Sequence, residues 1–183
     1  MKKPLVWIIV VGLIFISAIL IWRRISSRRQ VMNEQNSTLK ITSPAFAQNS
    51  QIPQKYTCKG ENISPPLNIT GVPEGAKSLV LILHDPDAPN GDFTHWLVWN
   101  IPSNTATINE NSAPSGAIEG TNGAGKTGYM GPCPPSGTHH YLFEIYALDY
   151  EIQAPNTTDQ PSLRNMLEGH LLSKDTLTGL FGH

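Results

Sequence analysis

The strongest constraint on the fold is the way proline, glycine and asparagine divide the chain from Leu39 onward into short apolar runs. The sequence contains 15 prolines and 15 glycines, a composition that favours strands and loops over long helices. Residues 79–83 and 96–99 are apolar throughout, as is typical of strands that are buried on both faces. Residues 141–148 form a third strong strand candidate, and 55–57 and 67–69 are weaker ones.

One segment has the period of a helix instead. In residues 161–172, apolar side chains recur at the i, i+3, i+4 and i+8 spacing of one helical face, at Leu163, Met166, Leu167 and Leu171. Several strands followed by a single late helix predict a mainly β protein, with the helix packed at the end or edge of a β-sandwich.

The N-terminus predicts a membrane anchor. Residues 4–22 form a run of 19 uncharged residues between two lysines and four arginines. As a helix this run is about 28 Å long, close to the thickness of a bilayer core of roughly 30 Å. We therefore expect an uncleaved transmembrane helix over residues 1–22, a polar linker over 23–38 and one domain over 39–183. This organisation predicts a single-pass membrane protein, and the flanking charges leave its orientation open.

Charge and cysteine content exclude some classes of function. The formal net charge is −1, and no basic stripe follows residue 40. The sequence therefore lacks the cluster of basic residues that is typical of nucleic-acid-binding proteins. Cys58 and Cys133 are 75 residues apart and have no zinc-binding spacing. Whether they form a disulfide or remain two thiols is left open by the sequence.

Polar side chains gather where the three strong strands begin or end. The first strand runs into Asp85, the second is entered through His95, and the third is entered through His139 and Tyr141. Prolines stiffen the loops beside these residues, and binding residues are often placed on such loops. His139 and His140 are adjacent, so on a strand at most one of them faces a given pocket, and Tyr141 shares the face of His139. If the three strands are neighbours, these side chains form one pocket.

These motifs together resemble the phosphatidylethanolamine-binding protein family, in its bacterial Raf-kinase-inhibitor-like branch. The first signature is similar to the DPDAP run at 85–89 followed by the His-Trp pair at 95–96. The second is similar to GPCPP at 131–135 with GTHHY at 137–141. Further likeness lies at 43–46, 52–53, 56–60 and 64–67, so the resemblance covers about residues 39–182.

The resemblance implies an antiparallel β-sandwich with a C-terminal helix and a pocket that binds anions. The family's pocket corresponds to five side chains and one backbone amide of this chain. They are Asp85, His95, Pro134, His139 and Tyr141, with the amide of Cys133. The expected ligands are phosphate-bearing molecules, such as phospholipid head groups or phosphorylated residues. We expect non-enzymatic binding without a cofactor.

Three other functions are weighed against this one. A hydrolase would need Ser136 or Cys133 as its nucleophile, but no G-x-S-x-G motif is present. A metal site could use His84 together with the pocket residues, yet no HExxH or H-x-H spacing supports it. The main alternative is a protein–protein regulator that inhibits a protease or kinase through surface loops, for which residues 104–126 are long and polar enough.

Overall fold

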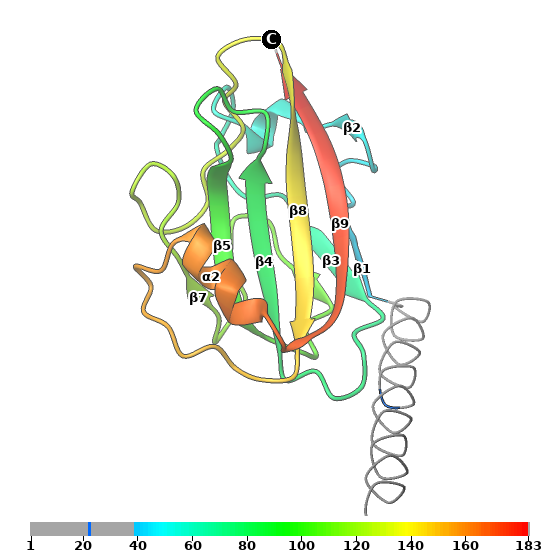
Figure 1. Cartoon of the computed structure of the whole chain (residues 1–183). Coiled ribbons are helices and arrows are strands. Elements are labelled where there is room, and N and C mark those ends of the chain that lie inside the picture. Colours follow the sequence, from blue (N-terminus) through cyan, green and yellow to red (C-terminus); the bar gives the residue numbers. More distant parts are fainter. Residues whose placement is uncertain (1–21, 23–38, 183) are drawn as a thin grey trace, which may run out of the picture. The chain divides into compact units, whose positions relative to one another are not determined.

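A computed structural model describes Trp22 and residues 39–182 of the chain, and residues 39–182 fold into two sheets and one late helix (Figure 1). The elements, in chain order, are β1 (Lys40–Thr42), β2 (Ser50–Gln51), the 3-10 helix η1 (Gln54–Tyr56), β3 (Leu67–Thr70), β4 (Ser78–Asp85), β5 (Phe93–Pro102), β6 (Thr107–Ile108), β7 (Ile118–Glu119), β8 (Thr138–Leu148), α2 (Gln160–Leu167) and β9 (Leu171–Gly182).

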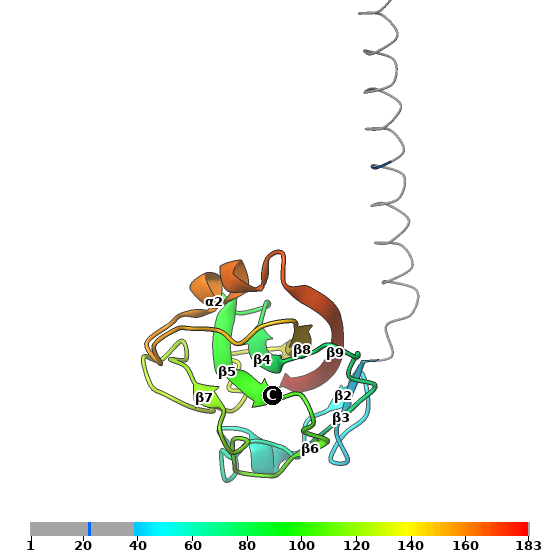
Figure 2. The ribbon, with the colours of Figure 1, turned by 90° about the horizontal axis from the view of Figure 1, so that it is seen from below.

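The larger sheet has six strands in the order β2-β9-β8-β4-β5-β7, and the smaller sheet has three in the order β1-β3-β6. Their pairs are antiparallel, apart from β2, which runs parallel to β9. Figure 2 shows α2 on one side of the large sheet and β1, β3 and β6 on the other. The large sheet is therefore covered on both faces, as its apolar strands require.

Alternate residues of the large sheet enter two separate cores. One core joins the large sheet to the small one, through residues such as Leu81, Phe143 and Ile69. The other joins the opposite face to α2, with Ile82 and Leu163 among its members. Because β4 contributes to both cores, its residues are buried along its whole length, and this explains the uninterrupted apolar run at 79–83.

The mainly β fold and most of its elements are confirmed. The strands predicted at 79–83, 96–99, 141–148 and 67–69 lie inside β4, β5, β8 and β3. The weak strand predicted at 55–57 is wrong, because this segment turns as η1 after Pro53. The loop predicted at 104–126 carries the short strands β6 and β7.

The predicted helix is correct at its start and too long at its end. Asp159 caps α2 by accepting a hydrogen bond from the amide of Ser162. The helix ends at Leu167, and Gly169, with a φ of 79°, reverses the chain. Leu171 then opens β9 and pairs with Leu148 of β8. Pairing with a distant strand thus overrides the helical spacing of Leu171.

The predicted transmembrane helix over residues 1–22 is not supported, and the single-pass membrane localisation is corrected with it. In the described part of the chain, no helix is long and apolar enough to cross a membrane. The helix α2 has 8 residues and is about 12 Å long, whereas a bilayer core is about 30 Å thick. Apart from Trp22, the predicted anchor and the linker at 23–38 lie outside the described residues.

Candidate functional site

Three strand ends meet at one edge of the large sheet. β4 lies between β5 and β8 and is antiparallel to both. The C-terminal end of β4 is therefore placed beside the beginnings of β5 and β8. This arrangement brings Asp85, His95 and His139 around one cavity. The three strands are thus neighbours, as the predicted pocket requires.

Asp85 and His139 form a buried pair. The Nδ1 atom of His139 lies 2.8 Å from Oδ2 of Asp85. His139 is 8% exposed and Asp85 is 3% exposed. The other oxygen of Asp85 accepts the backbone amide of Asp87 at 2.9 Å. Both oxygens of Asp85 are therefore engaged, so the carboxylate fixes the imidazole ring of His139 and the start of the 86–92 loop.

His95 is held from a different part of the chain. Its Nδ1 atom lies 2.7 Å from the carbonyl oxygen of Met130. Its ring packs edge-on against Phe93 and Tyr141, with centroids 5.0 and 5.2 Å apart. Burial lowers the pKa of His95, and the carbonyl of Met130 and the carboxylate of Asp85 only partly oppose this effect.

The ring of Tyr141 lies against the rings of both histidines. Its ring stacks on that of His139 at 6.5 Å and meets that of His95 edge-on. The residue is fully buried, and its hydroxyl has no hydrogen-bond partner among the described residues. Burial, reinforced by the negative charge of Asp85, raises the pKa of Tyr141. The hydroxyl therefore stays protonated and can donate or accept a hydrogen bond.

The cavity has a volume of about 200 Å³, smaller than the 300–1,000 Å³ or so of pockets for drug-sized ligands. Its lining residues are Asp85, Ala88, Pro89, Phe93, His95, Met130, Cys133, Pro134, Pro135 and His139. Most of this wall is apolar, with the carboxylate and the two imidazoles as its ionisable groups. The space suits a compact polar group rather than a large ligand.

A disulfide between Cys58 and Cys133 settles the question that the sequence left open. It joins the 131–137 loop to the segment that follows η1. The same junction has two hydrogen bonds, from the amide of Cys58 to the carbonyl of Pro132 at 3.1 Å and from the amide of Gly131 to Oδ1 of Asn62 at 2.8 Å. The wall of the cavity that contains Cys133 and Pro134 is therefore covalently clamped.

All six predicted site residues are at or next to this cavity. Five of them line it, and Tyr141 contacts two of those five. Phe93 and Met130 were missed. Phe93 precedes His95 by two residues on β5, so the two-residue period of a strand was a usable signal. The contact of His95 with Met130 crosses 35 residues of sequence, and no local pattern indicates it.

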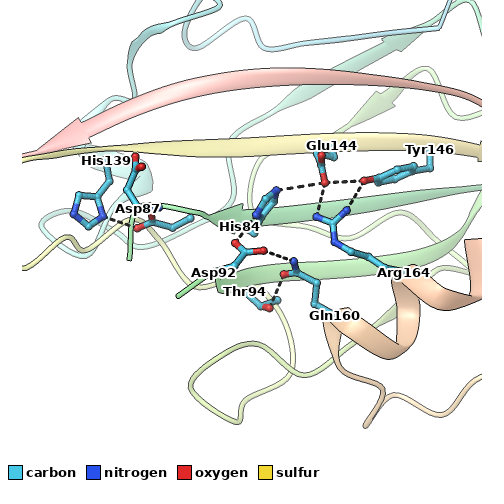
Figure 3. Close-up of polar contacts among 10 residues, drawn as sticks. His84, Asp87, Asp92, Thr94, His139, Glu144, Tyr146, Gln160 and Arg164 are labelled. Carbon is cyan, nitrogen blue, oxygen red and sulfur yellow. Dashed lines mark hydrogen bonds and ion pairs between the residues drawn. The ribbon is translucent and has the colours of Figure 1, made fainter. Parts of the chain in front are cut away.

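His140 and His84 lie apart from the cavity. His140 is exposed and pairs with Asp87, its Nδ1 atom 2.7 Å from Oδ2. His84 belongs to the face of β4 that α2 covers (Figure 3). A metal site combining His84 with the cavity histidines is therefore not assembled. Among the described residues, no cluster of three or more histidine, cysteine or acidic side chains is arranged to hold a metal.

A second polar cluster surrounds His84 (Figure 3). The Nδ1 atom of His84 is 2.5 Å from Oδ1 of Asp92, a residue of the loop that carries Ala88 and Pro89. Its Nε2 atom is 3.3 Å from Oε2 of Glu144, an ion-pair contact without hydrogen-bond geometry. Burial lowers the pKa of His84, but the two carboxylates outweigh it and the net pKa is raised.

Glu144 is the anionic centre of this cluster. The guanidinium of Arg164, on α2, donates to Oε2 of Glu144 at 2.6 Å, and the hydroxyl of Tyr146 donates to the same oxygen at 2.7 Å. Burial opposes ionisation, yet His84, Tyr146 and Arg164 together lower the pKa of Glu144 to about 2. The cluster therefore ties β8, α2 and the 86–92 loop together.

Comparisons with known proteins point to one family. The family model described as phosphatidylethanolamine-binding protein matches residues 42–182. A UPF0098 protein of Methanothermobacter thermautotrophicus is 44% identical over 148 residues, which are 78% of this chain and 98% of the relative. A UPF0098 protein of Chlamydia trachomatis is 39% identical over 148 residues, again 78% of this chain and 98% of the relative.

Solved structures agree with the sequence matches. A phosphatidylethanolamine-binding protein homologue from Chlamydia trachomatis superposes with a TM-score of 0.77 at 38% identity, covering 80% of this chain and 99% of that one. YbcL of Escherichia coli, described as a member of the mammalian family, has a TM-score of 0.75 at 30% identity, covering 79% and 98%.

Proposed function

The chain belongs to the phosphatidylethanolamine-binding protein family, and we propose that it binds small phosphate-bearing ligands without transforming them. The observation that carries the proposal is the pair of buried, anchored histidines at one small cavity. Asp85 holds His139 and the carbonyl of Met130 holds His95. Neither ring has to be ordered when a ligand arrives, so little entropy is lost there on binding.

The phosphate group is expected to be bound by the imidazoles. A protonated imidazole donates a charge-assisted hydrogen bond to a phosphate oxygen, which contributes roughly 1.5–3 kcal/mol. One such bond, with a second hydrogen bond to the other imidazole, offsets little more than the cost of association, so a small phosphate alone should bind with a Kd of around 1 mM. Tighter binding would require the rest of the ligand to contact the apolar wall.

Two observations favour binding over hydrolysis. Cys133 is disulfide-bonded, so its sulfur is not available as a thiolate nucleophile. Ser136 is not among the residues that line the cavity. An activated nucleophile must lie within hydrogen-bond reach of a base, and the residues that line the cavity include no serine, threonine or free thiol.

The test is a titration of the full chain with O-phosphoethanolamine, followed through the histidine ring signals by NMR. We expect His95 and His139 to shift together and to saturate with one Kd. This Kd should fall as the pH is lowered, because an anion that binds beside Asp85 needs a proton on the site or on the phosphate to balance the charge. His139→Ala should abolish the saturable shift. His170→Ala is the matched control, since His170 pairs with Asp149 at an exposed position and is absent from the cavity lining.

Two results would contradict the proposal. One is an absence of any saturable shift up to tens of millimolar ligand. The other is turnover of a phosphoester that is lost in the His139→Ala variant, which would show that the same residues act catalytically.

A further inference from the structure

Both cavity histidines use the same nitrogen to bind the protein. The Nδ1 atom of His95 faces the carbonyl oxygen of Met130, and the Nδ1 atom of His139 faces the carboxylate of Asp85. A carbonyl or a carboxylate oxygen only accepts hydrogen bonds, so each Nδ1 must carry the proton. In a neutral imidazole the remaining nitrogen is then an acceptor. The cavity is therefore lined by two Nε2 lone pairs when both rings are neutral.

Two acceptor nitrogens repel an unprotonated anion unless protons are supplied. The lining residues include no lysine or arginine, so none of them brings a permanent positive charge to compensate a phosphate. Asp85 adds a negative charge of its own, buried next to His139. Protons on the imidazoles or on the ligand are what remains to balance the charge, and the position of each proton determines which ligand fits.

The two rings face different partners. The Nδ1 atom of His139 faces the carboxylate of Asp85, a negative charge that can balance a positive one beside it. His95 faces a neutral carbonyl, and its ring is enclosed by Phe93 and Tyr141. Burial lowers its pKa, so a charge on this ring is disfavoured.

The charged groups around His95 do not reverse this difference. From β4, Asp85 attracts a proton to the ring, whereas protonated His84 on the other face opposes it. From the loop before β5, Asp92 attracts a proton, but it is itself bound by His84. On β8, the ring of His139 is hydrogen-bonded to Asp85, and Tyr141 is a neutral hydroxyl. His95 is therefore the ring that stays neutral.

We propose that this cavity recognises a phosphomonoester that carries one proton, with His139 donating to one phosphate oxygen and His95 accepting the ligand's P–OH. The inference rests on the proposed function and names its ligand class. In this complex the imidazolium of His139 and the carboxylate of Asp85 compensate each other, and the phosphate has a single negative charge.

A phosphodiester has no proton to give, so its complex leaves the Nε2 lone pair of His95 facing an anionic oxygen. Protonating His95 instead would place a charge on the ring that the cavity is least able to compensate. The cavity should therefore discriminate against the diester head groups of ordinary phospholipids. It should favour monoesters, whether these come from a small metabolite or from a phosphorylated side chain.

The experiment compares methyl phosphate with dimethyl phosphate, using the full chain at pH 5.5 and NMR titration. At this pH a phosphomonoester, whose second pKa is about 6, is mostly a monoanion like the diester, so the two probes differ by one methyl group and one proton. We expect methyl phosphate to bind at least about tenfold more tightly than dimethyl phosphate. In the dimethyl phosphate complex, one hydrogen bond is lost and the Nε2 acceptor of His95 is left facing an anionic oxygen. Glycerol 1-phosphate, a bulkier monoester, controls for size and should bind about as well as methyl phosphate.

A second measurement locates the proton. The ¹⁵N resonance of His95 Nε2 should report an unprotonated nitrogen in the free protein and a hydrogen-bond acceptor in the methyl phosphate complex. The His139 Nε2 resonance should become that of a protonated nitrogen. In a His95→Gln variant, where the amide can donate without a titrating proton, the preference for methyl phosphate should fall below about threefold.

Each outcome has a separate meaning. If methyl and dimethyl phosphate bind equally, or if His95 Nε2 carries a proton in the complex, the proton-matching inference is refuted while phosphate binding stands. If His95→Gln keeps the full preference, His95 is not the acceptor and the inference also fails. If neither phosphate binds, the proposed function itself is wrong.

Discussion

Removing the disulfide between Cys58 and Cys133 should lower the free energy of unfolding by several kilocalories per mole. We consider the double substitution Cys58→Ser and Cys133→Ser. Both cysteines are exposed in the folded domain, so serine leaves no cavity in the core. The effect should therefore come mainly from the loss of the cross-link.

The magnitude follows from the length of chain that the bond closes. The two cysteines are separated by 75 positions in the sequence. The chain-entropy relation gives a loss of about 15 cal/mol/K for a loop of this length, or about 4.5 kcal/mol at 25 °C. Disulfides typically contribute about 2–4 kcal/mol, so we expect a destabilisation of about 2–4.5 kcal/mol.

Urea unfolding followed by tryptophan fluorescence measures this change. The midpoint should fall, and the dependence of the unfolding free energy on urea should steepen, because an unlinked unfolded chain exposes more surface. Wild-type protein that has been reduced with dithiothreitol is the matched control and should behave like the double variant. A difference below about 1 kcal/mol between oxidised and reduced wild-type protein would refute the reasoning, since a long loop would then have been closed at no entropic cost.

Two further predictions concern acid stability and the loop 131–137. The pKa of Glu144 is about 2 in the folded protein, below the 4.5 of an unperturbed glutamate, so its ionisation adds stability that is complete above about pH 4.5 and is lost as the pH falls toward 2. The shift corresponds to about 3 kcal/mol. Glu144→Gln should therefore flatten the fall in unfolding free energy that is measured between pH 5 and 2. If the variant loses unfolding free energy with pH as steeply as the wild type, the low pKa of Glu144 is not the cause. Gly131→Ala should destabilise by about 1–3 kcal/mol and weaken phosphate binding, because its Cβ would lie 2.6 Å from the carbonyl oxygen of Tyr56 and 2.7 Å from Oδ1 of Asn62. Gly137→Ala, with open space at the Cβ position but a φ of 69°, is the comparison and should cost about 1–2 kcal/mol while leaving phosphate affinity closer to wild type; equal losses of affinity would argue against the clash.

Local patterns in the sequence predicted the main strands because burial leaves a local record. The apolar run at 79–83 indicated a strand because β4 has a core on each face. Residues 141–148 were likewise predicted as a strand, and they lie in β8 of the same sheet. β9 was missed because its first residue, Leu171, fits the helical spacing of 161–172. Only the turn at Gly169 and the pairing with β8 separate the two elements.

The sequence by itself determined which side chains could form the site. Asp85, His95 and His139 stand where apolar runs meet proline-rich loops, and a carboxylate with two imidazoles fits the anion site that we propose. The resemblance of these motifs to one family predicted the fold of the domain, which the family and structure matches support.

Only the tertiary structure decided how those groups work together. The order β8-β4-β5 brings the three strand ends to one cavity, and the contact with Met130 fixes which nitrogen of His95 is left for a ligand. The structure likewise pairs Cys58 with Cys133 across 75 positions and places His84 with Asp92 and Glu144 on the opposite face. Apart from the contact of His84 with Asp92, these contacts join residues that are far apart in the chain, so local spacing and periodicity leave no record of them.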